Sequence, residues 1–292
     1  MINRRQFLAA TGASALFGYP AAASTLNMRE IPGRGESLSA VGLGNSVAFR
    51  EGDAATARKL LQTYFDRGGR YVDCGGSSAE LVASTARELG FKDQAFLGVY
   101  LSGGEADQST HFARALLEIA GKDSIDLVHA FPEDGVPNWE QFRRWKDEGL
   151  ARYIGLARHR PKFYEMMMSV MQTGTLDFLQ VNLSPLETDA EERILPMALD
   201  KGVAVTINRP FINGEYFSVV RGKELPEWAA EFDCHSWAQF SLKYVLSHPA
   251  VTCVLTETAN PRHVEDNLGG GIGRLPDDKT RAQMRQLIQS FR

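Results

Sequence analysis

The 292-residue sequence has few cysteines, no long apolar run and no concentration of basic residues. Three cysteines are too few for a disulfide framework, although Cys234 and Cys253 could pair in an oxidising compartment. No apolar run reaches the roughly 20 residues that span a bilayer, so no stable membrane span is expected in the mature chain. A net charge of −4 argues against a nucleic-acid partner, which needs a concentrated basic surface. No residue spacing typical of metal ligands is present, so no metal site is predicted.

The sequence also lacks the short motifs of several common enzyme classes. It has no Ser-His-Asp arrangement, no Gly-x-Gly-x-x-Gly after an expected strand, and no phosphate-binding loop of the Gly-Lys-Ser type. A dinucleotide, if one binds, would therefore not use the Rossmann arrangement.

The first 23 residues are typical of an export signal. A basic pair precedes a mildly apolar stretch, and small residues make a peptidase site plausible after Ala23. Residues 3–8 resemble the twin-arginine signal, which predicts export of the folded protein to the periplasm by the twin-arginine machinery. That route would let a cytoplasmic cofactor travel inside the protein. An ordinary secretion signal or a basic tail is the alternative.

Strand and helix patterns alternate through the rest of the chain. A short hairpin is expected over 26–31 and 37–41. The stretch before Asn45 is expected to supply the first of eight strands, and the others are expected at 71–72, 95–101, 125–131, 151–156, 178–182, 203–207 and 251–255. Helices are expected at 54–67, 80–90, 111–120, 139–148, 161–172, 190–200, 236–247, 261–268 and 278–291. Such alternation over roughly 260 residues predicts a (β/α)8 TIM barrel in a single domain, 24–292.

Polar side chains stand at the carboxyl ends of the expected strands. They are Asn45, Asp73, Tyr100, His129, Arg158, His159, Gln180, Asn182, Arg209 and Thr258. Each has an ordinary structural explanation, and Asp73 could simply cap the glycine turn that follows it. In a barrel, however, all would converge on one rim, where ligands bind. A carboxylate beside a phenol or a cation, with an imidazole, could supply the proton for carbonyl reduction without a metal.

Several segments occur in the order and form typical of one family. They are 41–44, 71–73, 124–127, 149–155, 180–186, 246–251 and 258–267. On these segments the chain resembles the aldo-keto reductases over nearly its whole mature length. The resemblance implies a barrel that holds a nicotinamide dinucleotide, usually NADPH, across its rim.

By position, the resemblance also implies which residues bind the cofactor. Gln180 would hold the carboxamide together with Arg158 and His159. The residues that would border the pyrophosphate are Asn208, Arg209, Pro210 and Phe211. The adenosine end would contact Thr258, His263 and Asn267. Glu257 departs from the family and would repel a 2′-phosphate, which favours NADH or no cofactor.

The catalytic tetrad of the family, Asp, Tyr, Lys and His, is only partly kept. Asp73 matches the Asp, but Ser78 stands at the offset of the Tyr and Tyr100 at that of the Lys. The family His comes five residues after the position of Asp126, whereas His129 comes three after it. Because strand side chains alternate with period two, His129 shares that face and is expected one step deeper.

Loss of the Lys leaves Asp73 without a cation unless Arg158 or Arg209 reaches it. An unpaired carboxyl in a partly apolar pocket would have a raised pKa. The proton donor would then be Tyr100, His129 or protonated Asp73, or there would be none.

Two functions follow from these patterns. The first is an oxidoreductase that transfers hydride between NADPH or NADH and a small carbonyl or alcohol substrate, with Asp73, Tyr100 and His129 as a modified acid site. The alternative is a catalytically inactive barrel that binds a ligand or a partner, with or without a cofactor.

Overall fold

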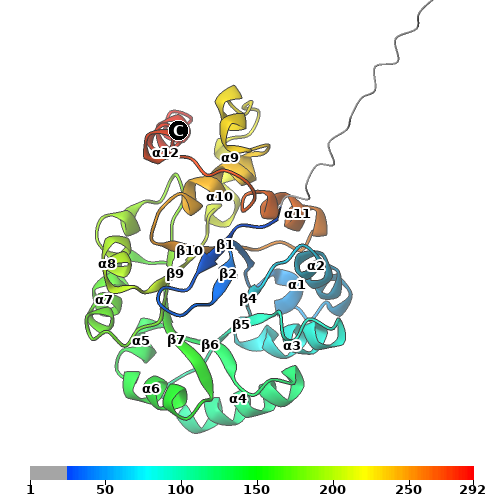
Figure 1. Cartoon of the computed structure of the whole chain (residues 1–292), viewed down its shortest axis with the longest axis vertical. Coiled ribbons are helices and arrows are strands. Elements are labelled where there is room, and N and C mark those ends of the chain that lie inside the picture. Colours follow the sequence, from blue (N-terminus) through cyan, green and yellow to red (C-terminus); the bar gives the residue numbers. More distant parts are fainter. Residues whose placement is uncertain (1–24) are drawn as a thin grey trace, which may run out of the picture.

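The computed structural model describes residues 25–292, so the expected signal, 1–23, lies outside the described residues. Eight parallel strands form a closed barrel ringed by helices (Figure 1). Strand order around the barrel follows the chain, and pairing of the last strand with the first closes it. The barrel strands are β3 (Val41–Leu43), β4 (Tyr71–Asp73), β5 (Phe96–Tyr100), β6 (Ile125–Ala130), β7 (Ala151–Ala157), β8 (Phe178–Asn182), β9 (Ala204–Asn208) and β10 (Val251–Thr256). The predicted (β/α)8 barrel is confirmed.

The helices follow the expected alternation. They are α1 (Val47–Arg50), α2 (Ala54–Asp66), α3 (Ala79–Glu88), α4 (Ala106–Ala120), α5 (Pro132–Gly135), α6 (Trp139–Asp147), α7 (Tyr164–Gln172), α8 (Ile194–Lys201), α9 (Glu215–Val219), α10 (Trp237–Leu246), α11 (Pro261–Gly269) and α12 (Asp278–Gln289). The expectation that a helix begins at His111 is wrong, because α4 begins five residues earlier. Its polar first turns are stabilised by Ser109, whose hydroxyl donates to the carbonyl of Ser102 (2.9 Å) and accepts from its N–H (3.1 Å).

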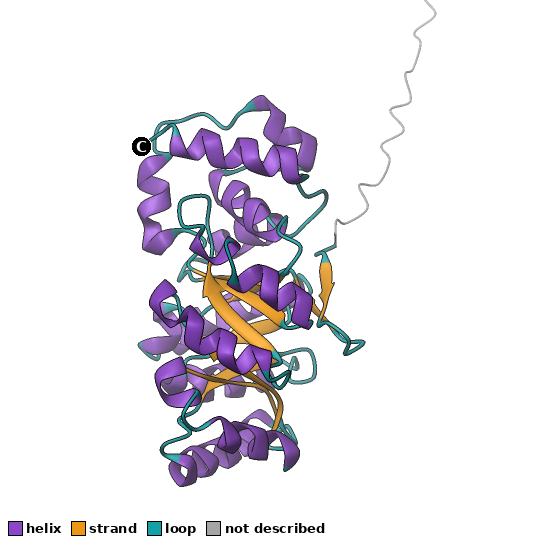
Figure 2. Cartoon of the chain, turned by 90° about the vertical axis from the view of Figure 1, so that its left-hand side faces the viewer, coloured by secondary structure: helices purple, strands orange, loops and turns teal. Residues whose placement is uncertain are grey.

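The predicted hairpin is also confirmed and lies over one end of the barrel (Figures 1 and 2). It consists of β1 (Met28–Glu30) and β2 (Ser37–Ser39). Ile31 and Leu38 from this hairpin pack with the side chains inside the barrel, at the amino ends of the strands. The carboxyl ends therefore form the open rim.

The interior of the barrel is layered. Its apolar layer includes Tyr71, Phe96, Leu127, Tyr153 and Phe178. Side chains alternate along a strand, so positions two or four residues further on face the same interior, nearer the rim. Asp73, Tyr100 and Gln180 stand at such positions. This alternation explains how the sequence delivers polar groups to one end of an otherwise apolar barrel.

The described chain contains three free, buried cysteines. Cys253 packs inside the barrel, whereas Cys234 belongs to the cluster between the barrel and its helices. The pairing of these two that the sequence allowed is not formed. Within residues 25–292, no helix is long and apolar enough to span a membrane, and no cluster of side chains suited to a metal ion is present.

Candidate active site at the carboxyl rim

A pocket of about 890 Å³ opens at the rim. This volume lies in the upper part of the range of roughly 300–1,000 Å³ typical of ligand sites. The predicted site residues that line it are Asp73, Tyr100, Arg158, His159, Gln180, Asn208, Arg209, Pro210 and Phe211. The structure therefore brings most of the residues singled out from the sequence to one place.

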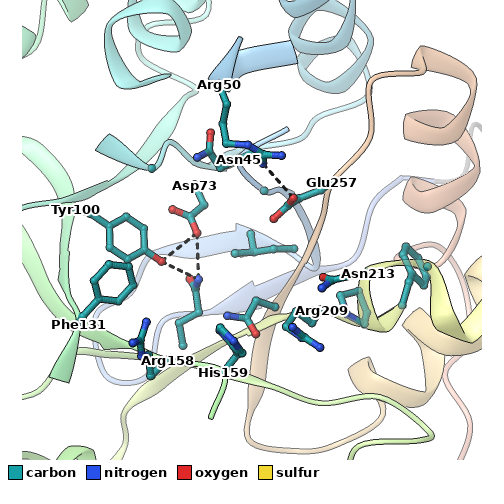
Figure 3. A pocket seen from close by; sticks show the side chains of 18 of the residues that line it. Asn45, Arg50, Asp73, Tyr100, Phe131, Arg158, His159, Arg209, Asn213 and Glu257 are labelled. Atoms are coloured by element: carbon teal, nitrogen blue, oxygen red, sulfur yellow. Dashed lines mark hydrogen bonds and ion pairs between the residues drawn. The ribbon is translucent and has the colours of Figure 1, made fainter. Parts of the chain in front are cut away.

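Three of these side chains form a hydrogen-bonded cluster at the floor of the pocket (Figure 3). The amide nitrogen of Gln180 donates to Asp73 Oδ2 and to the Tyr100 hydroxyl, at 3.0 Å each. The Tyr100 hydroxyl donates to Asp73 Oδ2 over a longer 3.4 Å. Thr206 donates to Gln180 Oε1 at 3.1 Å, which fixes the orientation of the amide. The side chain of Gln180 thus holds Asp73 and Tyr100 together.

The Asp73 carboxyl has no cation beside it. Arg158 instead donates to Glu133 at 2.6 Å, and Arg209 lies 3.6 Å from Glu187. Burial raises the pKa of Asp73 to about 7; the Gln180 and Tyr100 hydrogen bonds lower it, and Glu257 raises it. This direction is the one expected for a buried carboxyl without a cation beside it. Within the described chain, Asp73 Oδ1 is buried and has no hydrogen-bond partner.

Tyr100, which the resemblance placed at the offset of the family Lys, carries no positive charge. Burial, followed by the neighbouring Asp73 carboxylate, holds the pKa of Tyr100 well above its ordinary value. The phenol therefore stays protonated. Its ring packs against the ring of His129, with centroids 5.3 Å apart, and against that of Phe131, at 5.2 Å.

His129 faces the barrel interior but does not line the rim pocket. Its Nε2 pairs with the Tyr71 hydroxyl at 3.0 Å, and burial lowers its pKa to about 3. In the described part of the chain, His129 Nδ1 has no hydrogen-bond partner. Phe131 lines the pocket and stands five residues after Asp126, the offset that the resemblance gives for the family His. The sequence reasoning overlooked Phe131, although the offset identified it.

Ser78, at the offset that the resemblance gives for the family Tyr, is held within the turn after β4. Its hydroxyl is within hydrogen-bond distance of Asn45 Oδ1 (2.5 Å) and of the Gly75 carbonyl (2.9 Å). Asn45 and Gly75 line the pocket, whereas Ser78 does not. Ser78 therefore shapes the turn after β4.

The residues expected at the adenosine end lie away from this pocket. Thr258 and His263 pair with each other (3.3 Å), and Asn267 is buried on α11. None of these three lines the rim pocket. Glu257 does line it, and its carboxylate lies 3.4 Å from Arg50.

Comparison with known proteins identifies the family. A sequence profile described as the aldo/keto reductase family matches residues 40–287. A search of curated proteins found no match. Among solved structures, an aldo-keto reductase from Bacillus halodurans in its holo form has a TM-score of 0.71 at 19% identity, with 91% of this chain and 96% of that chain covered.

Two structures from Klebsiella pneumoniae are also similar. An aldo-keto reductase in complex with NADPH has a TM-score of 0.70 at 17% identity, covering 91% of this chain and 95% of that chain. Another, in complex with NADP and acetate, has a TM-score of 0.67 at 18% identity, covering 89% and 95%. At these identities the solved structures establish the fold alone, and the profile over residues 40–287 establishes the family. The chain belongs to the aldo/keto reductase family.

Proposed function

We propose that the protein is a nicotinamide-dependent oxidoreductase that interconverts a small carbonyl compound and its alcohol, with protonated Asp73 as the acid. The dinucleotide, when bound, supplies the hydride to the carbonyl carbon. Asp73 supplies the proton to the carbonyl oxygen, and in the reverse direction its carboxylate accepts that proton. This assignment selects one of the three donors that the sequence left open.

The observation that carries the proposal is the surroundings of the Asp73 carboxyl, which is buried and has no cation beside it because Arg158 and Arg209 pair with glutamates. A pKa of about 7 keeps a large share of it protonated at neutral pH, which is the property a general acid needs. Gln180 and Tyr100 occupy Oδ2, so Oδ1 is the oxygen left to carry the proton. The Tyr100 phenol is a poor alternative because its pKa is raised well above 10.

The pocket offers groups suited to a dinucleotide. Asn208 Oδ1 and Arg209 Nε are buried without partners among residues 25–292, one as an acceptor and the other as a donor. Arg209, Pro210 and Phe211 line the pocket at the positions that border the pyrophosphate in the family. Gln180 is already engaged by its neighbours, so we assign the carboxamide to Arg158 and His159. Complexes of related reductases with NADPH and NADP support this class of cofactor.

Glu257 favours NADH over NADPH in this proposal. Its side chain lines the pocket beside Gly44, where an added Cβ would approach Glu257 Cγ to 2.7 Å. A 2′-phosphate bound nearby would be repelled by this charge, although Arg50 offsets part of it. Tryptophan fluorescence titrated with each nucleotide should give a lower Kd for NADH.

Mutation and pH test the acid. Reduction should fall about tenfold per pH unit above pH 7, as the Asp73 proton is lost, and Asp73→Asn should lower kcat by roughly 10² to 10⁴. Tyr100→Phe removes a donor that stabilises the Asp73 carboxylate, so it should shift the profile to higher pH and keep most of the activity. Collapse of activity in Tyr100→Phe with retention in Asp73→Asn would reverse the assignment.

The inactive, ligand-binding alternative is favoured by Ser78, Tyr100 and Phe131, which replace three of the four family catalytic groups. Measuring nucleotide binding distinguishes the two functions. Protein purified without added nucleotide, and then titrated with NADH and NADPH, should show nicotinamide absorbance or fluorescence quenching. No binding of either nucleotide would leave the inactive barrel as the function.

The N-terminal pattern supports a further proposal, that the folded protein is exported to the periplasm by the twin-arginine machinery. Replacing Arg4 and Arg5 with Lys should leave the protein in the cytoplasm, which cell fractionation measures. Unchanged export would point to another route.

A further inference from the structure

Two phenylalanines in the rim pocket expose a large part of their surface. Phe131 is 48% exposed and Phe217 is 41% exposed, and both line the pocket. The other large apolar side chains exposed in the described chain, Met28, Val47 and Leu199, lie outside it. An aromatic ring that faces water inside a concave pocket is stabilised when a ligand covers it.

Neighbouring groups hold the ring of Phe131 in place. Its centroid lies 5.2 Å from that of the Tyr100 ring and 4.8 Å from the guanidinium carbon of Arg158. Arg158 is itself fixed, because it donates to Glu133 at 2.6 Å. The carbonyl of Phe131 accepts from the N–H of Gly135 at 2.7 Å, which fixes the backbone at the start of α5. The ring is therefore an apolar wall that is formed before a ligand binds, so binding orders little.

Tyr100 connects this wall to the proposed acid. Its hydroxyl lies 3.4 Å from Asp73 Oδ2, while its ring packs against Phe131. Tyr100 and Phe131 lie together on one side of Asp73, and Asn213 lies on the other side (Figure 3). A carbonyl group placed at Asp73 would thus have an aromatic surface beside it. A group attached directly to the carbonyl carbon would lie against that surface.

The polar groups beside this wall are engaged by other residues or buried. The Tyr100 hydroxyl accepts from Gln180 at 3.0 Å and donates to Asp73. Arg158 donates to Glu133, and its Nε, which has no partner in the described chain, is buried. The side chain of Phe131 has no hydrogen-bonding atom. The hydroxyl groups of a polyhydroxy aldehyde would lose their hydrogen bonds to water here without replacement, whereas an aromatic ring has none to lose.

We propose that Phe131 is a specificity-determining residue whose ring receives an aromatic or conjugated group attached directly to the carbonyl carbon of the substrate. The substrates are then aryl and other conjugated aldehydes and ketones, and polyhydroxy aldehydes are poor substrates. This inference rests on the proposed carbonyl reduction for the reaction, but the contact with Phe131 can be measured without turnover.

Alcohols that correspond to the two substrate classes measure this contact. Benzyl alcohol, cyclohexylmethanol and glycerol are titrated calorimetrically into the mature protein saturated with NADH, where no oxidised nucleotide is present to react with them. Benzyl alcohol should bind about tenfold or more tightly than glycerol, because it covers the Phe131 ring. It should also bind more tightly than cyclohexylmethanol, since aromatic rings pair favourably with one another. Equal binding of benzyl alcohol and cyclohexylmethanol would overturn the preference for an aromatic group.

Two variants of Phe131 and a matched control assign the contact to this side chain. Phe131→Ala should weaken binding of benzyl alcohol about tenfold or more, and that of glycerol far less. Phe131→Leu keeps an apolar side chain and should give an intermediate affinity for benzyl alcohol. Leu199→Ala, at a 52% exposed position outside the pocket, should change neither affinity. Benzyl alcohol affinity equal in wild type and both Phe131 variants, or no tighter than that for glycerol, would overturn the inference.

Turnover with NADH separates this inference from the proposed function. The value of kcat/KM for benzaldehyde should exceed that for glyceraldehyde about tenfold or more, and Phe131→Ala should reduce this ratio. Reduction of both aldehydes with a ratio that Phe131→Ala leaves unchanged would support the function and overturn the inference. If neither aldehyde is reduced while Phe131→Ala still weakens binding of benzyl alcohol, the proposed function fails and the contact stands. Loss of benzyl alcohol binding on saturation with NADH would mean that the nicotinamide covers Phe131, which would also overturn the inference.

Discussion

The buried carboxyl group of Asp73 links the stability of the barrel to pH. A pKa raised from 3.8 to about 7 means that the folded chain holds a proton that the unfolded chain has released between these values. Folding therefore becomes less favourable as pH rises from about 4 to 7, by up to roughly 4 kcal/mol. Asp73→Asn keeps the shape and removes this penalty, so it should stabilise the protein above pH 7 and have little effect near pH 4.

Thermal unfolding of wild type and Asp73→Asn at pH 4.5 and pH 8 measures this difference. Asp93→Asn is the control, because the Asp93 side chain is 86% exposed and should behave alike at both pH values. Equal Tm values for wild type and Asp73→Asn at pH 8 would mean that the Asp73 carboxyl is not destabilised by burial. A gain in stability with a loss of activity is expected of a functional group.

Asp73, Tyr100 and Gln180 could be named from the sequence because the period of a strand fixes which residues share the barrel interior. The glutamates that pair with Arg158 and Arg209 could not be named from the sequence. Glu133 lies on a four-residue helix and Glu187 in the loop after β8, and their contacts depend on loop paths and side-chain rotamers. The offset of the family His identifies Phe131 as the residue at that position. The sequence analysis assigned the pocket imidazole to His129 instead and therefore did not name Phe131.

At the scale of elements, Tyr64 on α2 ties the strand that carries Asp73 to its neighbours. Its hydroxyl lies within 3.0–3.1 Å of the carbonyls of Val41 and Tyr71, the N–H of Arg70 and the hydroxyl of Ser39. These groups belong to β2, β3 and β4 or precede them directly. One buried phenol thus links backbone groups of β3 and β4 with the Ser39 side chain of β2.

Tyr64→Phe should cost about 1–3 kcal/mol of stability, because several buried polar groups lose their partner. The chain offers a matched control in Tyr216, which is equally buried but whose hydroxyl has no partner within residues 25–292. Tyr216→Phe should be neutral or stabilising. Chemical denaturation of both variants measures the difference, and equal effects would contradict the role of Tyr64.

The amphipathic pattern of α2 placed Tyr64 on its buried face, yet the pattern treats the residue as apolar packing. Its hydrogen bonds involve β2, β3 and β4, and no local periodicity encodes such distant contacts. The packing of Tyr64 also explains why residue 69 is a glycine, because an added Cβ there would approach the Tyr64 ring to 2.3 Å. The sequence thus specifies where elements form more readily than how they are joined.

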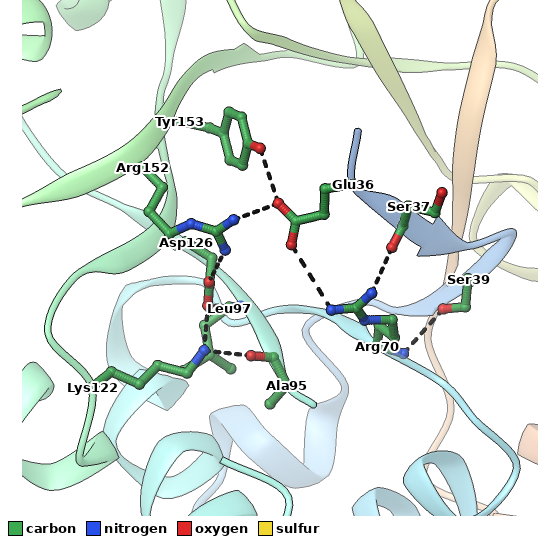
Figure 4. A network of polar contacts seen from close by, with 10 residues as sticks. All are labelled: Glu36, Ser37, Ser39, Arg70, Ala95, Leu97, Lys122, Asp126, Arg152 and Tyr153. Carbon is green, nitrogen blue, oxygen red and sulfur yellow. Dashed lines mark hydrogen bonds and ion pairs between the residues drawn. The ribbon is translucent and has the colours of Figure 1, made fainter. Parts of the chain in front are cut away.

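At the scale of the whole molecule, the pocket and the hairpin lie at opposite ends of the barrel. The rim at the carboxyl ends holds the pocket, as is usual for this fold, and the hairpin covers the amino ends. Glu36, between β1 and β2, accepts from Arg152 and from the Tyr153 hydroxyl (2.9 Å) and lies 3.8 Å from Arg70 (Figure 4). Arg152 also donates to Asp126 (2.7 Å), which lies in segment 124–127, one of those typical of the family.

Glu36→Gln should therefore weaken the attachment of the hairpin to the barrel without altering the pocket. Loss of the charge leaves Arg70 and Arg152 with a weaker acceptor, which should cost about 1–3 kcal/mol. For a chain of this length, that lowers Tm by about 2–4 °C per kcal/mol. Glu140→Gln, in an exposed helical pair with Arg143, is the control and should cost at most about 0.5 kcal/mol.

The same two variants also test the separation of the barrel ends. Nucleotide affinity at 25 °C should be unchanged in Glu36→Gln, because the hairpin and the pocket lie at opposite ends of the strands. A fall in Tm with constant nucleotide affinity would show that the hairpin stabilises the barrel without affecting the pocket. If Glu36→Gln were no more destabilising than Glu140→Gln, the apolar contacts of Ile31 and Leu38 alone would hold the hairpin in place.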